Sequence, residues 1–486
     1  MPSTNLTENE QDLPPLSART IALRRRLKVL AITASVVLVA GGFAAWRLWP
    51  SAAAKPVHPA PCPACVTDGA PAFEPGSQPM RAVQAAIARA DARVRTDGKP
   101  YVTVALLNPF TATPQGDVSL PRMVDQLWGA YLAQTSMNAS GVLGVQLILA
   151  NQGTSDEPTA VKAARQLETL EGAPDHLVAV VGLGLSIAAS ESAAQTLARS
   201  DVPMFGAVIS ADQFNSSLFK TMNLAQPGVL VQVVPAVGVQ VDKLATVIGK
   251  PARSVLVFDQ QATDLYTGDL KADFSRVFRA SLGGRQPSPY TPGDEDDAEF
   301  KYIASSVCYT QGTPPDVLYA GRASVLASLV QHLQNDPNCA GKKITIVTGG
   351  DGDGLALSAT KSAAGQGQVS VTYSDIMNLS GLTPGFKTAY ARTLASFDPT
   401  ETGLQSTWMA ATYDSMMAAW TAIAAAYSPH PQTLPTRGDV GQLAELLTGQ
   451  NAVPGATGKF SLAPGGQLIS PVIPVFKDSA GQRSAY

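Results

Sequence analysis

Residues 176–200 read HLVAVVGLGLSIAASESAAQTLARS, and this stretch indicates the fold class. Its first part, Leu177 to Val181, is continuously apolar, which is typical of a strand buried on both faces. Gly182 and Gly184 permit a tight turn, and the alanine-rich segment from Ala188 has the composition of a helix. A buried strand that turns directly into a helix is the repeating unit of parallel sheets, so this stretch predicts an α/β protein.

Apolar runs of the same kind recur on both sides of this stretch, separated by helix-like segments. They are YVTVALL from Tyr101, VQLILA from Val145, PMFGAVI from Pro203, SVLVFD from Ser254, DVLYAG from Asp316 and KITIVTGG from Lys343. The runs fall into two blocks, residues 101–230 and 231–350. A mixed tail follows, with a strand at 369–373, a long helix at 408–427 and a hairpin around Pro464. We therefore predict two Rossmann-like α/β lobes with parallel sheets.

The composition excludes several classes of function. The chain has 486 residues with 35 Lys and Arg against 38 Asp and Glu, so it has no basic excess for binding nucleic acid. None of the four histidines follows a predicted strand, and the sequence contains no G-x-S-x-G, H-E-x-x-H or P-loop motif. We expect no enzyme activity, no cofactor and no metal site. A protein that handles a small molecule fits this composition.

The N-terminal residues predict a membrane anchor. A basic cluster at residues 19–28 precedes an uncharged run at 29–46. As a helix, this run of about 18 residues spans about 27 Å, enough for a bilayer core. Because basic flanks stay in the cytoplasm, we predict a cytoplasmic tail at 1–27, a single transmembrane helix at 28–49 and an extracellular main domain. A cleaved secretory signal ending near residues 52–54 is the alternative, and it also exports the main domain.

A segment rich in alanine, proline and glycine follows the predicted anchor. We predict that residues 50–98 form a stalk and, from Met80 to Thr96, a helix that packs on the next domain. Cys62 and Cys65 lie in this segment as PCPAC. Outside the cell they can join each other or a second chain. The neighbouring prolines argue against a redox motif at a helix start, so we predict a structural Cys62–Cys65 disulfide.

The other two cysteines predict a second disulfide through chain geometry. Cys308 ends a predicted helix just before the strand DVLYAG, and Cys339 follows the next helix just before KITIVTGG. Helix ends that lead into successive parallel strands lie at the same edge of a sheet, and right-handed crossovers place both helices on one face. The two thiols can therefore approach within bonding range, and we predict a Cys308–Cys339 disulfide.

The carboxyl ends of the predicted strands carry the candidate ligand-binding residues, because ligands of open α/β sheets bind there. The candidates are Phe110, Leu185, Ser186, Ile209, Ser210, Tyr266, Arg322 and Asp351. The turn from Gly182 to Ser186 is the strongest of these signals, since N–H groups at a helix start bind carboxylates and phosphates. A plain structural turn explains the same residues equally well.

From Tyr101 to Lys477 the chain resembles the type I periplasmic binding proteins, in particular the leucine/isoleucine/valine-binding branch. The segments that carry the resemblance include VVGLGLS, PMFGAVIS, FDQQATDLYTGDL, DVLYAGR, TGGDG, ATYDSMMAAW and GKFSLAPGG. The chain also resembles the membrane-tethered forms of high-GC Gram-positive bacteria. The resemblance implies two lobes joined by three crossovers, with lobe 1 at 99–230 and 373–470 and lobe 2 at 231–372 and 471–486.

The resemblance also implies a role for each candidate residue. In that family two lobes close on a small ligand, commonly an amino acid held by its carboxylate and its ammonium. Ser186 falls at the carboxylate-binding serine, and Ile209 and Ser210 fall at the pair that follows in the next loop. Tyr266 matches an aromatic residue of the site, and Asp351 falls where an acid binds the ammonium.

Arg322 departs from the family, which often has an aromatic residue at that position. A cation there favours a ligand with an extra acidic group, or it pairs with Asp351 or Asp353. We expect a membrane-anchored extracellular protein that binds a small amino-acid-like ligand and delivers it to an ABC permease or reports it as a sensor. The alternative is a cell-surface interaction protein on a degenerate binding fold with no small-molecule ligand.

Overall fold

The computed structural model describes residues 62–486, apart from 71, 75, 114–117, 142, 213, 216–229, 250, 261–263, 294–295, 311, 356, 395–403 and 405. The predicted tail at 1–27 and transmembrane helix at 28–49 lie outside the described residues. Among the helices that are described, none combines the length and the apolar character that crossing a bilayer requires.

The first sheet has six strands in the order β1-β3-β2-β4-β5-β6. They are β1 (Val66–Thr67), β2 (Tyr101–Asn108), β3 (Gly144–Asn151), β4 (Leu177–Gly182), β5 (Met204–Gly206) and β6 (Leu230–Gln232). Strands β2 to β6 run parallel, and β1 pairs antiparallel with β3. Successive residues of β2 enter different cores, with Val104 and Leu106 on one face and Ala105 and Leu107 on the other. This burial on both faces is what the continuous apolar runs predicted.

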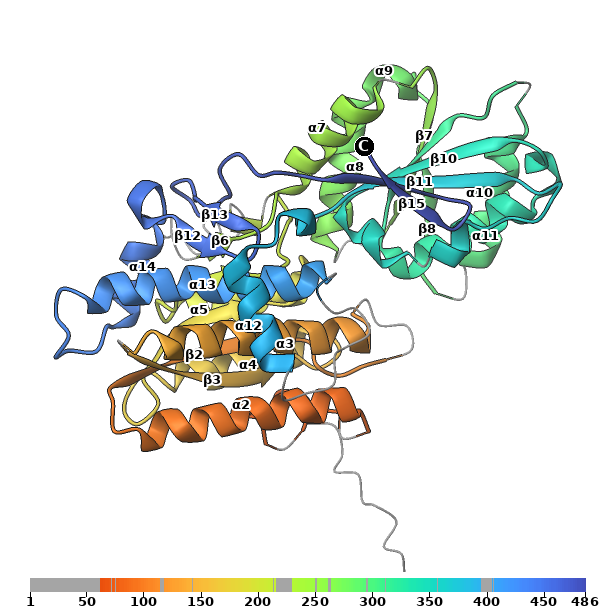
Figure 1. Ribbon diagram of the computed structural model, residues 1–486. Coiled ribbons are helices and arrows are strands. Elements are labelled where there is room, and N and C mark those ends of the chain that lie inside the picture. Colours follow the sequence, from red (N-terminus) through yellow and green to blue (C-terminus); the bar gives the residue numbers. More distant parts are fainter. Residues whose placement is uncertain are drawn as a thin grey trace, which may run out of the picture. The chain divides into compact units, whose positions relative to one another are not determined.

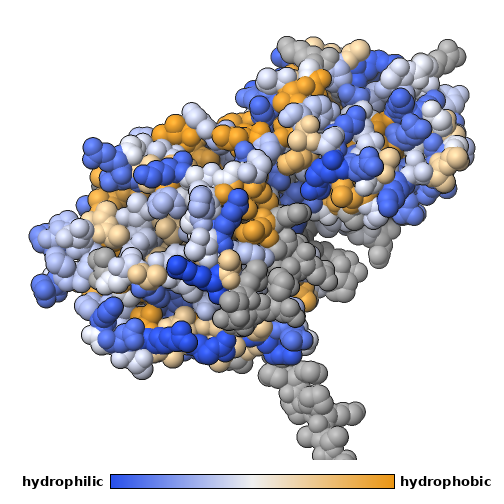
Figure 2. All heavy atoms as spheres, viewed as in Figure 1, coloured by the Kyte–Doolittle hydropathy of each residue, from blue (hydrophilic) through white to orange (hydrophobic). Residues whose placement is uncertain are grey.

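Helices cover both faces of the first sheet, and we call this assembly lobe 1 (Figure 1). The core on one face includes residues of α2 (Gln78–Thr96), α3 (Leu120–Ala139) and α13 (Thr407–Tyr427), and the core on the other includes residues of α4 (Glu157–Glu168) and α5 (Ala188–Ala198). Figure 2 shows hydrophilic side chains along the lower edge of the view, where α2 lies. Lobe 1 also contains α12 (Pro384–Leu394), α14 (Arg437–Ala444), β12 (Val453–Gly455) and β13 (Gly458–Phe460).

The second sheet has seven strands in the order β15-β14-β11-β10-β9-β7-β8, and with its helices it forms lobe 2. The strands are β7 (Ser254–Asp259), β8 (Ser288–Tyr290), β9 (Asp316–Ala320), β10 (Lys343–Thr348), β11 (Gln368–Ser374), β14 (Val475–Ser479) and β15 (Gln482–Ala485). The helices are α7 (Val237–Ile248), α8 (Leu265–Val277), α9 (Arg279–Leu282), α10 (Asp296–Cys308) and α11 (Ala323–Asn335). Residues of α7 and α8 enter one core of this lobe, and residues of α10 and α11 enter the other.

Short segments complete the structure and connect the lobes. The short 3-10 helices include η1 (Pro337–Cys339), η2 (Gly350–Gly354), η3 (Leu357–Thr360), η4 (Leu379–Gly381) and η6 (Gly449–Asn451). The chain passes between the sheets at residues 233–236, 375–383 and 469–474. The sheets are not purely parallel as predicted, because β1, β14 and β15 pair antiparallel at the edges. The predicted turn around Pro464 is present as an antiparallel bridge between Leu462 and Leu468.

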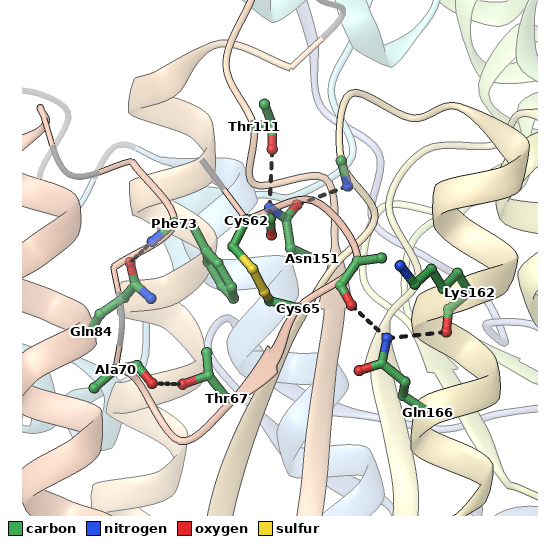
Figure 3. Close-up of a disulfide and its surroundings, with 12 residues drawn as sticks. Cys62, Cys65, Thr67, Ala70, Phe73, Gln84, Thr111, Asn151, Lys162 and Gln166 are labelled. Atoms are coloured by element: carbon green, nitrogen blue, oxygen red, sulfur yellow. Dashed lines mark hydrogen bonds between the residues drawn. A yellow bond between two sulfur atoms is a disulfide. The ribbon is translucent and has the colours of Figure 1, made fainter. Parts of the chain in front are cut away.

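The Cys62–Cys65 disulfide lies on the sheet of lobe 1 (Figure 3). The peptide groups of Ala64 and Cys65 pair with the backbone of Asn151 at the end of β3. The Asn151 side-chain amide also donates to the Cys62 carbonyl at 3.1 Å, and Gln166 donates to the Ala64 carbonyl at 2.7 Å. The part of the predicted stalk at residues 62–67 is therefore bound to lobe 1, and the packing helix predicted from Met80 to Thr96 is α2. The rest of the predicted stalk, up to residue 61, lies outside the described residues.

The Cys308–Cys339 disulfide is present as predicted, with Cα atoms 5.0 Å apart. It joins the end of α10 to η1, and both half-cystines are fully buried. Lys342 donates to the Cys308 carbonyl at 2.5 Å and to the Thr310 carbonyl at 3.1 Å, which fixes the same corner. The geometric argument from parallel strands therefore holds in lobe 2.

Candidate functional site

Five of the eight predicted site residues form one connected group. Ser210 contacts Ser186, Ser186 contacts Tyr266, and Tyr266 contacts both Asp351 and Arg322. Ser186 and Ser210 belong to lobe 1, whereas the other three belong to lobe 2. The strand-end argument thus identifies a region where the two lobes meet.

The turn after β4 has an unusual backbone. Gly182, Leu183 and Gly184 have φ angles of 90°, 69° and 72°, in the left-handed region that glycine adopts most readily. The turn leads through Ser186 into α5, and the Ser186 Oγ accepts hydrogen bonds from the N–H groups of Ser210 and Ala211 at 2.9 and 3.1 Å. Ser186 therefore ties the β4 turn to the loop after β5. Its hydroxyl hydrogen remains to donate to a further acceptor.

The backbone of Ser186 also joins lobe 1 to lobe 2. Its carbonyl accepts hydrogen bonds from the N–H groups of Leu265 and Tyr266 at 3.1 and 3.2 Å. These N–H groups belong to the first turn of α8, where an intrahelical acceptor is missing. Asp264 caps the same turn, accepting from the Thr267 N–H at 3.1 Å. The start of α8 therefore binds lobe 1 through its unpaired backbone donors.

Tyr266 extends the group to the turn after β10. Its hydroxyl accepts a hydrogen bond from the Asp351 N–H at 3.1 Å. A Cβ atom on Gly349 would lie 2.5 Å from this hydroxyl, so the glycine is required for the close approach. Burial raises the pKa of Tyr266 well above its ordinary value, which keeps the hydroxyl neutral.

Arg322 is paired at the start of α11. Its guanidinium binds the Asp264 carboxylate with two hydrogen bonds of 2.7 and 3.0 Å and lies over the Tyr266 ring at 4.6 Å. The sequence suggested pairing with Asp351 or Asp353, yet this two-bond pair goes to Asp264. Asp264 occupies the N-cap of α8, and nothing in its local sequence indicates a partner 58 residues away.

Arg122 is the important residue that the sequence argument missed. It lies in the first turn of α3, and its guanidinium reaches across to lobe 2. It binds Asp351 at 3.0 Å and Asp353 at 2.8 Å, and it lies over the Trp408 ring at 4.6 Å. A cation in the first turn of a helix is unfavourable next to the positive end of the helix dipole. The position of Arg122 was therefore a weak signal in the sequence that its side chain binds an acidic partner elsewhere. A Cβ atom on Gly354 would lie 2.4 Å from the guanidinium, so a larger residue there would displace Arg122 from this position.

The two acids of η2 respond differently to this pairing. Burial alone raises the pKa of Asp351, but the charges of Arg122 and Arg322 and the Ala323 N–H hold it below its ordinary value. The Asp351 side chain thus stays charged. Burial raises the pKa of Asp353 above its ordinary value, because Arg122 offsets burial only in part and Asp351 adds a like charge.

The three apolar candidates lie in the core of lobe 1. Phe110 is fully buried and stacks on Phe73 with ring centroids 5.2 Å apart. Leu185 and Ile209 are also buried in the two cores. Like many apolar residues that follow a buried strand, these three pack in the hydrophobic core. The contacts that connect the five polar and aromatic site residues do not include their side chains.

Unpaired hydrogen-bond donors surround the turn at Gly184. A Cβ atom on Gly184 would lie 3.2 Å from the Ser190 Oγ and 2.6 Å from the Gln152 Oε1. The Ser190 Oγ, the Gln152 Nε2 and the Asn108 Nδ2 are buried, and none has a partner among the residues that the structure describes. Within the same part of the chain, no group of three His, Cys, Asp or Glu residues is placed to hold a metal. The donors suit an anion rather than a cation.

No family model and no curated protein matches the sequence. Solved structures do match the fold. An ABC transporter substrate-binding protein from Desulfitobacterium hafniense, in complex with Leu, has a TM-score of 0.56 at 15% identity, covering 79% of this chain and 100% of that chain. The branched-chain amino acid transporter substrate-binding protein LivJ from Streptococcus pneumoniae, in complex with isoleucine, has a TM-score of 0.57 at 14% identity, covering 79% and 99%.

A third similar structure holds a different ligand. It is an ABC transporter solute-binding protein from R. palustris in complex with benzoate, with a TM-score of 0.54 at 12% identity, covering 79% of this chain and 95% of that chain. At these identities the likeness concerns the fold. The chain therefore has the α/β fold of the type I periplasmic binding proteins, with two lobes built on mixed, largely parallel sheets.

Proposed function

We propose that this chain is a membrane-anchored extracellular solute-binding protein that binds a small, amino-acid-sized molecule between its two lobes. Delivery to an ABC permease or reporting to a membrane sensor follows from such binding. The observation that carries the proposal is the connected group from Ser210 to Asp351, which brings the carboxyl ends of strands from both sheets together. Ligands of open α/β sheets bind at such strand ends.

The ligands of the similar structures support a small carboxylate. Leu, isoleucine and benzoate are bound by those proteins, and all three molecules carry a carboxylate. In this chain the Ser186 hydroxyl, the buried Ser190 hydroxyl and the first turn of α5 offer hydrogen-bond donors at one strand end. Donors of this kind at a helix start are suited to a carboxylate.

Export of the main domain is supported by the two disulfides. Cys62–Cys65 and Cys308–Cys339 account for all four cysteines of the chain. Disulfides persist in oxidising surroundings outside the cytoplasm. The predicted helix at 28–49 supplies the anchor in this proposal, and its test is the fractionation of the full chain with membranes before and after an alkaline carbonate wash.

A thermal-shift screen tests ligand binding. The full chain is heated with a library of amino acids, organic acids and other small metabolites, and a specific ligand raises the melting temperature. At one hundred times its dissociation constant a ligand adds about 2.7 kcal/mol to the stability. We expect at least one carboxylate to give such a shift, with saturation at one molecule per chain. A library without a single stabilising compound contradicts the proposal.

The pairing of Arg122 favours a second candidate function. Asp351 and Asp353 already hold a cation of the same chain and so are not free for a ligand ammonium, which would be the case in a binding fold that recruits a partner protein and has no small ligand. In that case no compound stabilises the protein, and replacing Arg122 changes stability without creating a binding site. The same thermal-shift screen, repeated on Arg122→Ala, therefore separates the two functions.

A further inference from the structure

The charged groups where the two lobes meet are matched within the chain. Arg122 pairs with Asp351 and Asp353, and Arg322 pairs with Asp264. The exposed fractions of these five side chains lie between 8% and 16%, so little water screens them. Ion pairs in such surroundings interact more strongly than surface pairs. The charged side chains that a ligand would contact in this region are therefore already paired with one another.

The oxygens of Asp351 are both in use. Its Oδ1 binds Arg122 at 3.0 Å, and its Oδ2 accepts the Ala323 N–H at 3.0 Å. A ligand ammonium at this carboxylate would compete with Arg122 for the same oxygen. It would also lie close to a guanidinium of the same sign, which is unfavourable at low exposure.

The Asp353 carboxylate is equally unsuited to bind a ligand ammonium. Its Oδ1 binds Arg122 at 2.8 Å, and its Oδ2 accepts the Thr407 hydroxyl at 3.0 Å. In the two acids of η2, each carboxylate oxygen thus already accepts a hydrogen bond from a protein donor. A buried ammonium without an acceptor loses its water and gains no replacement.

The opposite lobe shows the reverse situation, with donors that lack acceptors. The Ser190 Oγ, the Gln152 Nε2 and the Asn108 Nδ2 are fully buried or nearly so and have no partner in the part of the chain that the structure describes. Ser190 lies in the first turn of α5, whose N-cap residue, Ile187, cannot accept hydrogen bonds through its side chain. Unsatisfied buried donors at a helix start favour a negatively charged group.

We infer that the ligand of this site is a small organic acid that carries no ammonium group, and that Arg122 determines this preference. The inference rests on the proposed function. Lobe 1 supplies donors for the carboxylate of the ligand, while Arg122 takes the place that a ligand ammonium would occupy at Asp351 and Asp353. Arg122 is thus a specificity-determining residue that rejects amino acids and admits the corresponding acids.

Matched pairs of compounds test the inference by isothermal titration of the full chain. L-leucine is compared with 4-methylpentanoate and L-phenylalanine with 3-phenylpropanoate, because each pair differs only in the ammonium group. We expect the wild type to bind the acid about tenfold or more tightly than the amino acid. In Arg122→Ala the two carboxylates lose their cation. The ratio of the dissociation constants of the amino acid and the acid should therefore change at least tenfold in favour of the amino acid.

Two further variants control this comparison. Arg122→Lys keeps a cation at the site and should retain the preference for the acid. Arg276→Ala removes an exposed guanidinium that pairs with Asp242 and Asp273, and it should leave the ratio unchanged. If Arg122→Ala does not fold, Arg122→Gln removes the charge while keeping a hydrogen-bond donor, and it should shift the preference toward the amino acid in the same way.

The outcomes separate this inference from the proposed function. A wild type that binds the amino acid of each pair as tightly as the acid, or more tightly, overturns the inference and leaves solute binding intact. A ratio that is the same in wild type and Arg122→Ala overturns the role of Arg122. Absence of binding for every acid and amino acid, in the wild type and in both Arg122 variants, contradicts the proposed function itself.

Discussion

At the scale of single residues, Arg122 carries the largest expected effect on stability. Its removal leaves Asp351 and Asp353 buried without their cation. Breaking a buried ion pair from one side costs about 3–5 kcal/mol, so Arg122→Ala should lower the free energy of unfolding by about that amount in urea denaturation. The exposed pair of Arg276 is the matched control, and Arg276→Ala should cost less than about 1 kcal/mol. Equal losses in the two variants would contradict this account of the site.

The buried carboxyl group of Asp91 should make the stability of the protein depend on pH. It lies on α2, where its Oδ1 accepts the Gln134 amide at 2.6 Å and the Leu147 N–H at 2.9 Å. Burial raises the pKa of Asp91 to about 7 in the folded chain. The ordinary value of an aspartate in an unfolded chain is about 3.9. The folded state therefore binds more protons between these values, and its stability should fall as pH rises from about 4 to about 7.

Asp91→Asn tests this pH dependence, because asparagine keeps an acceptor oxygen and cannot ionise. Urea denaturation should show that the variant gains stability over the wild type as pH rises from 4 to 8. The gain has an upper limit of about 1.4 kcal/mol per pH unit. Burial raises the pKa of Asp212 and of Asp414 to about 7 as well, so the variant should keep a residual slope of the same sign. A difference between variant and wild type that does not change with pH contradicts the burial argument for Asp91.

At the scale of elements, the Cys308–Cys339 disulfide fixes the end of α10 against η1. It closes a loop with a sequence separation of 31, so its removal should cost roughly 3–4 kcal/mol on the chain-entropy model. The double variant Cys308→Ser with Cys339→Ser should therefore unfold at lower urea concentration than the wild type. Removing the Cys62–Cys65 pair, which closes a separation of only 3, should cost less.

Thiol counting checks the pairing itself. Denatured, unreduced wild type should show no free thiol, and the Cys308→Ser single variant should show one. Two or more free thiols in the unreduced wild type would show that the pairing is wrong. The Cys308→Ser and Cys339→Ser double variant should show no free thiol, whereas a mixed pairing of the four cysteines would leave two, so this count distinguishes the two bridges from a mixed pairing.

Strands and helices with strong local signals were predictable from the sequence. SVLVFD from Ser254 was predicted as a strand and forms β7 with the same bounds, because a run buried on both faces needs continuous apolar residues. The long helix predicted at 408–427 is α13, Thr407–Tyr427. The strand β1, Val66–Thr67, escaped prediction because two half-buried residues paired to a distant strand give no periodic pattern.

The convergence of the candidate residues was predictable from the sequence, and the contacts that they make were less so. Strand ends identified Ser186, Tyr266 and Asp351, because the topology of α/β sheets fixes where loops converge. The partners of these residues depend on side chains far away in the sequence, such as Arg122, which lies 229 residues before Asp351. Phe110 shows the converse. In the sequence, an apolar residue after a strand is equally compatible with the core and with a binding cleft, and in the structure Phe110 stacks on Phe73 in the core.

At the scale of the whole molecule, both backbone and charged groups join the two lobes. The Ser186 carbonyl and the first turn of α8 form one contact, and Arg122 with Asp351 and Asp353 forms another. The chain also crosses between the sheets at the three short segments 233–236, 375–383 and 469–474. The Arg122 ion pairs are buried and costly to break, so this contact holds the two lobes together.

A small acid that binds where Ser186 joins the lobes should lose affinity when the Ser186 hydroxyl is removed, and titration calorimetry on two serine variants measures this loss. The tightest compound from the thermal-shift screen is titrated into wild type, Ser186→Ala and Ser192→Ala. Ser192 lies on the same helix, α5, and its hydroxyl binds Glu157, so it controls for a general effect on that helix. We predict one ligand per wild-type chain, affinity reduced about tenfold in Ser186→Ala and unchanged affinity in Ser192→Ala. Equal affinity in all three proteins, or no binding to the wild type, would contradict the claim.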